Sequence, residues 1–161
     1  MSDQLRGKTA VITGASSGIG AAVAQRFASE GANLAISART LDNHATLSGS
    51  LNETANLCRQ YGGHVEVIQA DLADEKSRAT IIPKAIEALG SVNILINNAA
   101  AAIYKNLDAY TLKHRRLMTE INVQAPLDLI QHVLPSMISN RKGWIINLSS
   151  ASKKHPTGPP Y

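Results

Sequence analysis

The chain has 161 residues, of which 44% are hydrophobic and 17% are charged, a balance that is typical of one globular domain and excludes intrinsic disorder. Sixteen basic and twelve acidic residues give a formal net charge of +4, a mild excess that indicates an ordinary solvated surface rather than a nucleic-acid-binding one. Cys58 is the only cysteine, so the sequence excludes an intrachain disulfide framework and a multi-cysteine metal site.

Short apolar runs alternate with longer amphipathic segments, which predicts parallel strands covered by helices. Residues 9–13 (TAVIT) form a β-branched run that ends at a glycine, and they predict a buried strand. Residues 18–30 carry apolar side chains at helical spacing, and residues 33–38 (NLAISA) predict the second strand. A polar loop follows over residues 39–50.

Residues 50–61 begin with the Ser-x-x-Glu pattern of a capping box, in which the serine hydroxyl and the glutamate carboxylate each accept the other residue's backbone amide hydrogen. The pattern predicts a second helix there. Residues 65–69 predict the third strand. Residues 74–89 predict a helix that Pro83 would disturb, because proline has no backbone donor.

Residues 92–96 (VNILI) predict the fourth strand, since they form an almost continuous apolar run. Residues 111–139 predict a long helix that is bent near Pro126 and Pro135. Residues 144–148 (WIINL) predict the fifth strand.

Residues 149–161 contain three prolines and a glycine and predict a loop. The expected fold class is therefore α/β, a Rossmann-type three-layer fold with a parallel sheet that is truncated after the fifth strand. Residues 1–161 would form one incomplete domain, without the helix that should follow the fifth strand. We expect the sheet face that this helix would cover to be exposed.

The turn between the first strand and the first helix has the sequence Thr-Gly-Ala-Ser-Ser-Gly-Ile-Gly. Gly14 permits a tight turn, Gly18 leaves room for phosphate oxygens, and Gly20 allows the helix to pack closely. Free amide hydrogens at the helix N-terminus favour an anion. A purely structural turn is the alternative. The predicted phosphate-binding residues are Gly14, Ala15, Ser16, Ser17, Gly18, Ile19 and Gly20.

This Thr-Gly-x-x-x-Gly-x-Gly spacing resembles the short-chain dehydrogenase/reductase (SDR) family. Three later segments agree with the resemblance: residues 97–100 (NNAA), Asn122 within INV, and residues 147–150 (NLSS). The loops after Arg39 and Ser150 look like those of the family's hydroxysteroid dehydrogenase-like branch. Ala100 departs from the family pattern, which has glycine there.

The end of the second strand indicates which dinucleotide is bound. It has no carboxylate to bind the ribose hydroxyls and select NAD, but Arg39 offers a fork of donors that suits a phosphate. The sequence therefore predicts NADP(H), with NAD(H) less favoured. Asp42 lies close by and is the alternative group for the ribose.

The family resemblance implies further contacts with the cofactor. Asp71 resembles the family's adenine-contacting residue, although an Asp that caps a helix is an equally good interpretation. The remaining predicted cofactor-binding residues are Thr40, Leu72, Asn98, Ala99 and Ala100.

The resemblance also implies the catalytic residues. Ser150 matches the serine that bonds the substrate oxygen, with Ser149 as the second choice. Asn122 matches the asparagine that holds a water relay, although it could instead bond its own helix backbone. Tyr161 is the candidate tyrosine acid/base, and a Tyr-x-x-x-Lys further on is the alternative. The lysine that lowers the tyrosine's pKa in the family is absent from these residues.

The sequence thus predicts an NADP(H)-dependent oxidoreductase that interconverts an alcohol and a ketone or aldehyde. A catalytically silent dinucleotide-binding or interaction module is the alternative. The expected partners are a small-molecule substrate and, at full length, further copies of the chain. We expect no metal, since the histidines lack ligand spacing, and no nucleic-acid partner, since no aromatic residues accompany the basic cluster at residues 113–116. The polar N-terminus and the lack of a long apolar run predict a cytoplasmic protein without membrane contact.

Overall fold

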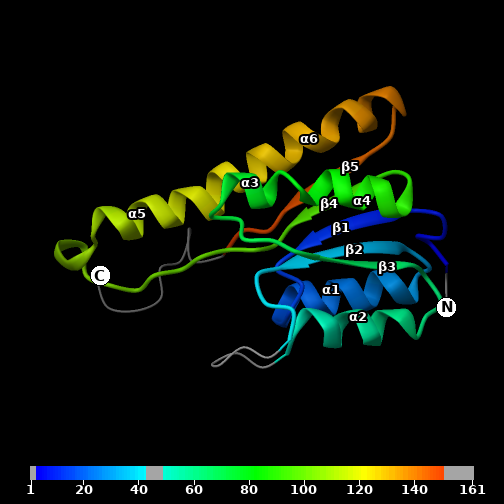
Figure 1. Ribbon diagram of the computed structural model, residues 1–161, viewed down its shortest axis with the longest axis horizontal. Coiled ribbons are helices and arrows are strands. Elements are labelled where there is room, and N and C mark those ends of the chain that lie inside the picture. Colours follow the sequence, from blue (N-terminus) through cyan, green and yellow to red (C-terminus); the bar gives the residue numbers. More distant parts are fainter. Residues whose placement is uncertain (1–2, 43–48, 151–161) are drawn as a thin grey trace.

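A parallel sheet forms the centre of the computed structural model, which describes residues 3–42 and 49–150. Within these residues five strands lie in the order β3-β2-β1-β4-β5, and each neighbouring pair is parallel (Figure 1). The strands are β1 (Thr9–Thr13), β2 (Asn33–Ala38), β3 (Val65–Gln69), β4 (Ile94–Asn97) and β5 (Trp144–Asn147). The chain adds strands outward from β1 to β3 and then crosses back to β4. Parallel strands need such crossover connections, and helices supply them.

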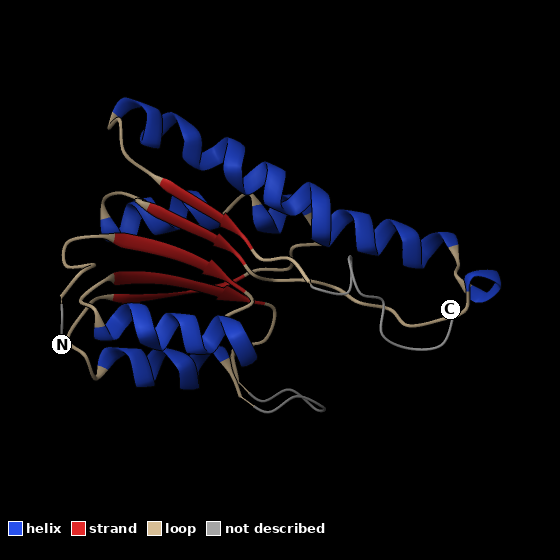
Figure 2. Ribbon diagram, turned by 180° about the vertical axis from the view of Figure 1, so that it is seen from behind, coloured by secondary structure: helices blue, strands red, loops and turns tan. Residues whose placement is uncertain are grey.

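Helices cover both faces of the sheet, which gives the three layers of a Rossmann-type fold (Figure 2). Helices α1 and α2 lie on one face, and α3, α4 and α6 lie on the other. The helices are α1 (Gly18–Ser29), α2 (Leu51–Arg59), α3 (Glu75–Arg78), α4 (Ile81–Leu89), α5 (Leu112–Thr119) and α6 (Ala125–Ser139). The predicted fold class is confirmed.

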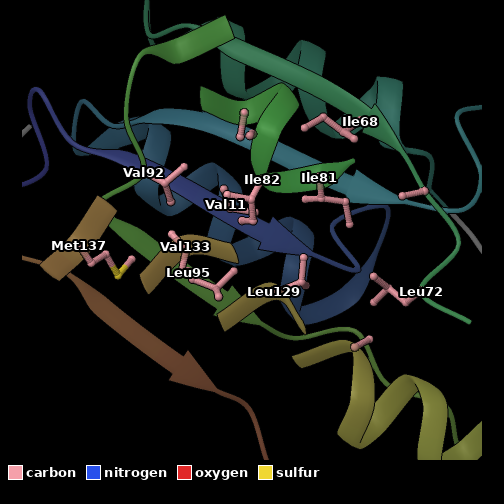
Figure 3. Packing of buried hydrophobic residues seen from close by; sticks show 14 of the residues in the cluster. Val11, Ile68, Leu72, Ile81, Ile82, Val92, Leu95, Leu129, Val133 and Met137 are labelled. Carbon is pink, nitrogen blue, oxygen red and sulfur yellow. The ribbon is translucent and has the colours of Figure 1, made fainter. Parts of the chain in front are cut away.

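The alternation of side chains along each strand divides the core into two clusters. Ala10 and Ile12 of β1 pack towards α1 and α2, whereas Val11 between them packs towards α4 and α6. On the second face, Ile82 of α4 and Val133 of α6 are almost completely buried (Figure 3). Burial of each such side chain stabilises the fold by about 1.5–3 kcal/mol.

Strands β1 and β2 have the predicted bounds, and β4 begins two residues later than expected. The difference arises at Asn93, whose side-chain oxygen accepts a hydrogen bond from the Thr9 amide at 2.9 Å. The Asn93 side chain thus replaces a strand hydrogen bond at this end of the sheet. At the start of α2, the Ser50 hydroxyl accepts the Glu53 amide hydrogen at 3.0 Å, which is one of the two hydrogen bonds of the predicted capping box.

The predicted helix over residues 74–89 is two helices, α3 and α4, separated by Ala79 and Thr80. Pro83 explains the break. In a continuous helix the carbonyl of Ala79 would need an amide hydrogen from Pro83, which has none. A helix that restarts at Ile81 places Pro83 in its first turn, where an amide has no partner within the helix.

The predicted helix over residues 111–139 is a continuous rod with a π-helical turn, Glu120–Gln124, between α5 and α6. The amide of Ala125 bonds to the carbonyl of Glu120, five residues back. The next residue is Pro126. It has no amide hydrogen to donate to the Asn122 carbonyl, as an α-helix would require. The extra residue of the π turn lies at this point. Helix α5 extends beyond the sheet (Figure 2).

Candidate functional site

A cleft of about 460 Å³ lies at the carboxyl ends of the strands. Between β1 and β4, the direction in which successive strands are added to the sheet reverses. Ligands of open α/β sheets bind in this position, and the volume suits a ligand site. The cleft is lined by Gly14, Ser16, Ser17, Ser37, Ala38, Arg39, Thr40, Gly49, Ala70, Asp71, Leu72, Asn98, Ala99, Ala100, Ala101, Ala102, Ile103, Leu117 and Ile121.

The glycine turn provides one wall of the cleft. Gly14 has φ +67° and Gly18 has φ +54°, a region that favours glycine. A Cβ atom on Gly18 would meet no atom within 4 Å, so the space beside its backbone is open. Ser17 occupies the N-cap position of α1 without a side-chain capping hydrogen bond, and the first turn of α1 contains no acidic residue. This end of the helix therefore suits an anion, whose charge the helix dipole would stabilise.

Gly20 is required for close packing inside the turn. A Cβ atom there would lie 2.3 Å from the Gly14 carbonyl oxygen and 2.5 Å from Nδ2 of Asn98. Helix α1 therefore approaches the turn and the loop after β4 more closely than any side chain would permit. The sequence predicted close packing by Gly20, and the structure identifies Gly14 and Asn98 as its neighbours.

Thr13 and Asn98 connect the glycine turn to the loop after β4. The Asn98 side-chain amide donates hydrogen bonds to the carbonyl oxygens of Thr13 at 2.9 Å and Gly14 at 3.1 Å. The Thr13 hydroxyl accepts hydrogen bonds from the amides of Asn98 and Ala99, at 3.2 and 3.1 Å. Asn98 therefore lines the cleft while its side chain holds the turn in position.

The predicted phosphate-binding residues occupy different environments. Gly14, Ser16 and Ser17 line the cleft. Ala15 is fully buried, and its amide donates to the Ser37 carbonyl at 3.1 Å, which attaches the turn to β2. Ile19 is 65% exposed. Neither Ala15, Gly18, Ile19 nor Gly20 belongs to the lining of the cleft in the described residues.

Arg39 and Thr40, two of the predicted cofactor-binding residues, follow β2 and line the cleft. Arg39 is exposed, and its carbonyl accepts a hydrogen bond from the Gln69 side chain at 2.9 Å, which fixes the backbone beside β3. Asp42, the alternative group for the ribose, is engaged elsewhere: its carboxylate accepts a hydrogen bond from the Asn52 side chain at 2.8 Å. Asp42 is not part of the cleft lining in the described residues.

Asp71 and Leu72 line the cleft after β3. One carboxylate oxygen of Asp71 accepts the Ala73 amide hydrogen at 2.9 Å, and the Ser77 hydroxyl accepts the Asp71 amide hydrogen at 2.9 Å. Asp74, not Asp71, caps α3. Asp71 thus stabilises its own turn and still faces the cleft.

The loop after β4 provides the opposite wall, which includes Ala99, Ala100 and Ala101. Asn122 in the π turn forms two hydrogen bonds with the backbone of Ala101, one to its carbonyl and one from its amide, each 2.9 Å long. Asn122 therefore bonds the neighbouring loop instead of its own helix backbone, the alternative interpretation of its sequence.

Arg78 is a buried cation beside this site, with a side chain only 5% exposed. It pairs with Glu120 and with Asp128, each at 2.6 Å, and it donates a hydrogen bond to the Leu72 carbonyl at 3.1 Å. Burial alone would lower the pKa of Arg78, but the hydrogen bonds and charges of Asp128 and Glu120 outweigh it and raise that pKa. Sequence analysis did not identify this group.

The predicted catalytic residues are only partly described. Ser150 is exposed and follows β5, whose pairing with β4 extends to a hydrogen bond from the Leu148 amide to the Asn97 carbonyl at 3.0 Å. Ser150 is not among the described residues that line the cleft, and neither is Asn122. Tyr161 lies outside the described residues.

Several cleft residues were missed by sequence analysis. Gly49, at the end of the loop after β2, returns to the glycine turn, where a Cβ atom on it would lie 2.7 Å from the Ser16 carbonyl oxygen. A glycine directly before the capping Ser50 was a usable signal. Ala102, Ile103 and Leu117 carry no such signal, since they are apolar residues in a loop and on a helix.

Over residues 3–42 and 49–150, no group of three or more His, Cys, Asp or Glu side chains could hold a metal ion. In the same ranges, no helix is long and apolar enough to cross a membrane.

Comparison with known proteins gives consistent matches. The family described as short chain dehydrogenase matches residues 8–161. Hydroxysteroid dehydrogenase-like protein 2 of Mus musculus is 33% identical over 153 residues, which cover 95% of this chain and 31% of that protein. The chain therefore spans about a third of the length of this curated relative.

Solved structures give the same result. A metagenomic short-chain oxidoreductase in complex with NADP has a TM-score of 0.86 at 31% identity, and the match covers 96% of this chain and 67% of that one. A short-chain type dehydrogenase/reductase from Mycobacterium marinum has a TM-score of 0.85 at 27% identity, with 98% of this chain and 62% of that one covered.

Proposed function

Because the chain belongs to the short-chain dehydrogenase/reductase family of oxidoreductases, we propose that its cleft binds NADP(H) and that the protein interconverts an alcohol and a ketone or aldehyde. The family membership accounts for the oxidoreductase class. The choice of NADP(H) and of the reacting group is the proposal.

The observation that carries the choice of cofactor is the position of Arg39. It lies at the carboxyl end of β2, exposed and on the wall of the cleft, where an acidic residue would favour NAD. A guanidinium group presents a planar fork of donors that suits the additional phosphate of NADP(H). Asp42, which could otherwise bind the ribose, is held by Asn52. A similar protein solved with NADP supports the same choice.

The glycine turn fits the remainder of a dinucleotide. The open space beside Gly18 and the uncapped, acid-free first turn of α1 would receive the pyrophosphate. We propose that Asp71, Leu72, Asn98, Ala99 and Ala100 complete the binding wall, all of which line the cleft.

When bound, NADP(H) supplies or accepts the hydride. The chain's own residues would place the substrate and move the proton. We propose that the Ser150 hydroxyl donates a hydrogen bond to the substrate oxygen and that Asn122 acts by holding Ala101, since both polar atoms of its side chain bond that backbone. Tyr161 remains the candidate acid/base, with a Tyr-x-x-x-Lys in a longer chain as the alternative.

Titration of the purified protein with NADPH and NADH, followed by cofactor fluorescence, tests the proposal. We expect NADPH to bind more tightly, but we expect no turnover by residues 1–161 alone, since they contain no Tyr-x-x-x-Lys. A longer chain with that pattern should consume NADPH with at least one member of a panel of ketones and aldehydes. NADPH binding without turnover by that longer chain would favour the dinucleotide-binding module. Equal affinity for the two cofactors would contradict the assignment to NADP(H).

A further inference from the structure

Arg78 connects two segments that lie far apart in the sequence, the turn after β3 and the α5–α6 rod. Its side chain is 5% exposed, and it pairs with Glu120 at one end of the π turn and with Asp128 in the first turns of α6. The same Nη1 atom that contacts Glu120 donates to the Leu72 carbonyl at 3.1 Å. We call these four residues the Arg78 clamp.

The π turn brings the two carboxylates of the clamp to one side of the rod. In an α-helix two full turns take about 7.2 residues. Glu120 and Asp128 are eight residues apart, so in a regular α-helix they would miss alignment on one side by about 0.8 residue. The π turn adds one residue to the first of these turns, since the Ala125 amide bonds to the carbonyl five residues back. The offset is largely removed, and one guanidinium reaches both carboxylates.

The clamp lies beside two segments of the cleft lining. Leu72 lines the cleft after β3, and Ile121, directly after Glu120, lines it from the rod. Asn122 follows Ile121 and holds both backbone groups of Ala101, which lies on the wall formed by the loop after β4. A continuous series of side-chain contacts and backbone links therefore leads from Leu72 through Arg78 and the π turn to Ala101.

We propose that Arg78 is a positioning residue of this cleft, which fixes the distance between its β3 wall and its rod wall and thereby orients Asn122 and Ala101 for dinucleotide binding. The identity of the ligand rests on the function proposed above, whereas the positioning of Ala101 does not.

Stability alone would not test this proposal. A buried ion pair contributes little net stability compared with uncharged groups of similar shape, whereas removal of one partner leaves buried charges without compensation. The informative variant therefore removes all three charges together: Arg78→Met, Glu120→Gln and Asp128→Asn. Such a triple variant keeps the side-chain sizes similar and loses the geometry that the charges impose.

Two measurements should be made on the full chain. The first is the hydrogen-exchange rate of the Ala101 amide without ligand, which reports on the Asn122 hydrogen bond. The second is the dissociation constant for NADPH. The matched control is Arg26→Met with Glu30→Gln, which removes an ion pair at the end of α1, and neither residue is among the described residues that line the cleft.

We expect the triple variant to exchange the Ala101 amide faster and to bind NADPH about tenfold more weakly, which corresponds to about 1.4 kcal/mol. The control should change neither value. Unchanged exchange at Ala101, or unchanged NADPH affinity despite faster exchange, would overturn the positioning role.

If the wild-type chain binds no NADPH, the proposed function fails, and the exchange rate of Ala101 alone decides whether the clamp positions this wall. If the triple variant does not fold, Arg78→Lys provides the same test, because a lysine keeps the charge but lacks the planar fork that reaches both carboxylates. It should show the same two changes in smaller size, and wild-type values in Arg78→Lys would overturn the proposal.

Discussion

Asn122 and Ala101 are joined by a pair of hydrogen bonds, in which the asparagine side chain pairs with both backbone groups of the alanine at 2.9 Å. The contact ties the π turn of the α5–α6 rod to the loop after β4, which forms one wall of the cleft. A residue that a family resemblance associates with the reaction therefore also has a clear structural task.

Replacement of Asn122 tests this contact. Asn122→Ala should lower the free energy of unfolding by about 1–3 kcal/mol, because two hydrogen bonds of about 0.5–1.5 kcal/mol each are lost. Urea denaturation measures the change. Asn52→Ala, which removes one exposed side-chain hydrogen bond to Asp42, is the control and should cost less. Equal costs for the two variants would show that the Ala101 contact contributes little.

Arg39→Ala tests the choice of cofactor. Loss of one charge-assisted hydrogen-bonded contact should cost about 1.5–3 kcal/mol, or roughly ten- to a hundredfold in NADPH affinity, and should leave NADH affinity almost unchanged. Parallel titrations with both cofactors measure the effect. Arg59→Ala on α2 removes the same charge outside the cleft and serves as the control. The assignment is wrong if NADPH affinity is the same in native protein and Arg39→Ala.

Gly18→Val tests the phosphate-binding turn. Gly18 and Gly7 both have positive φ, +54° and +73°, and at both a Cβ atom would meet nothing within 4 Å. A valine at either position should therefore cost a similar backbone strain, about 1–2 kcal/mol. Only Gly18→Val places a branched side chain where we propose the pyrophosphate lies, so only this variant should lose dinucleotide binding. Retained affinity in Gly18→Val would place the phosphate site elsewhere.

Cys58 gives a prediction about pH. Burial raises the pKa of this thiol from 9.0 to about 11, against the opposing charge of Arg59. Since the folded state holds the proton more tightly, the stability that this group contributes is complete below pH 9 and is lost as the pH rises to about 11. Denaturation at pH 8, 9, 10 and 11 should show a smaller decrease for Cys58→Ala than for the native protein. Parallel decreases in the two proteins would contradict the raised pKa.

Local sequence was sufficient for much of the fold. The β-branched run of β1 and the apolar run of β2 predicted the observed strand bounds. A strand that is buried on both faces of a parallel sheet needs such an almost continuous apolar run. The Ser50 cap was also predictable, since its donor and acceptor lie three residues apart. The glycine turn after β1 was also recognisable locally, and the structure places it at the edge of the sheet where the carboxyl ends of the parallel strands meet.

The sequence by itself thus determined the strands, the covering helices and the edge of the sheet at which the cleft lies, since these follow from side-chain periodicity and from glycine and proline within a few residues. Only the tertiary structure decided how the walls of the cleft are held. Arg78 and Asp128 are 50 residues apart, and their contact depends on the break before α4 and on the extra residue of the π turn. Such pairings depend on how whole helices pack against one another, and no local pattern along the chain contains that information.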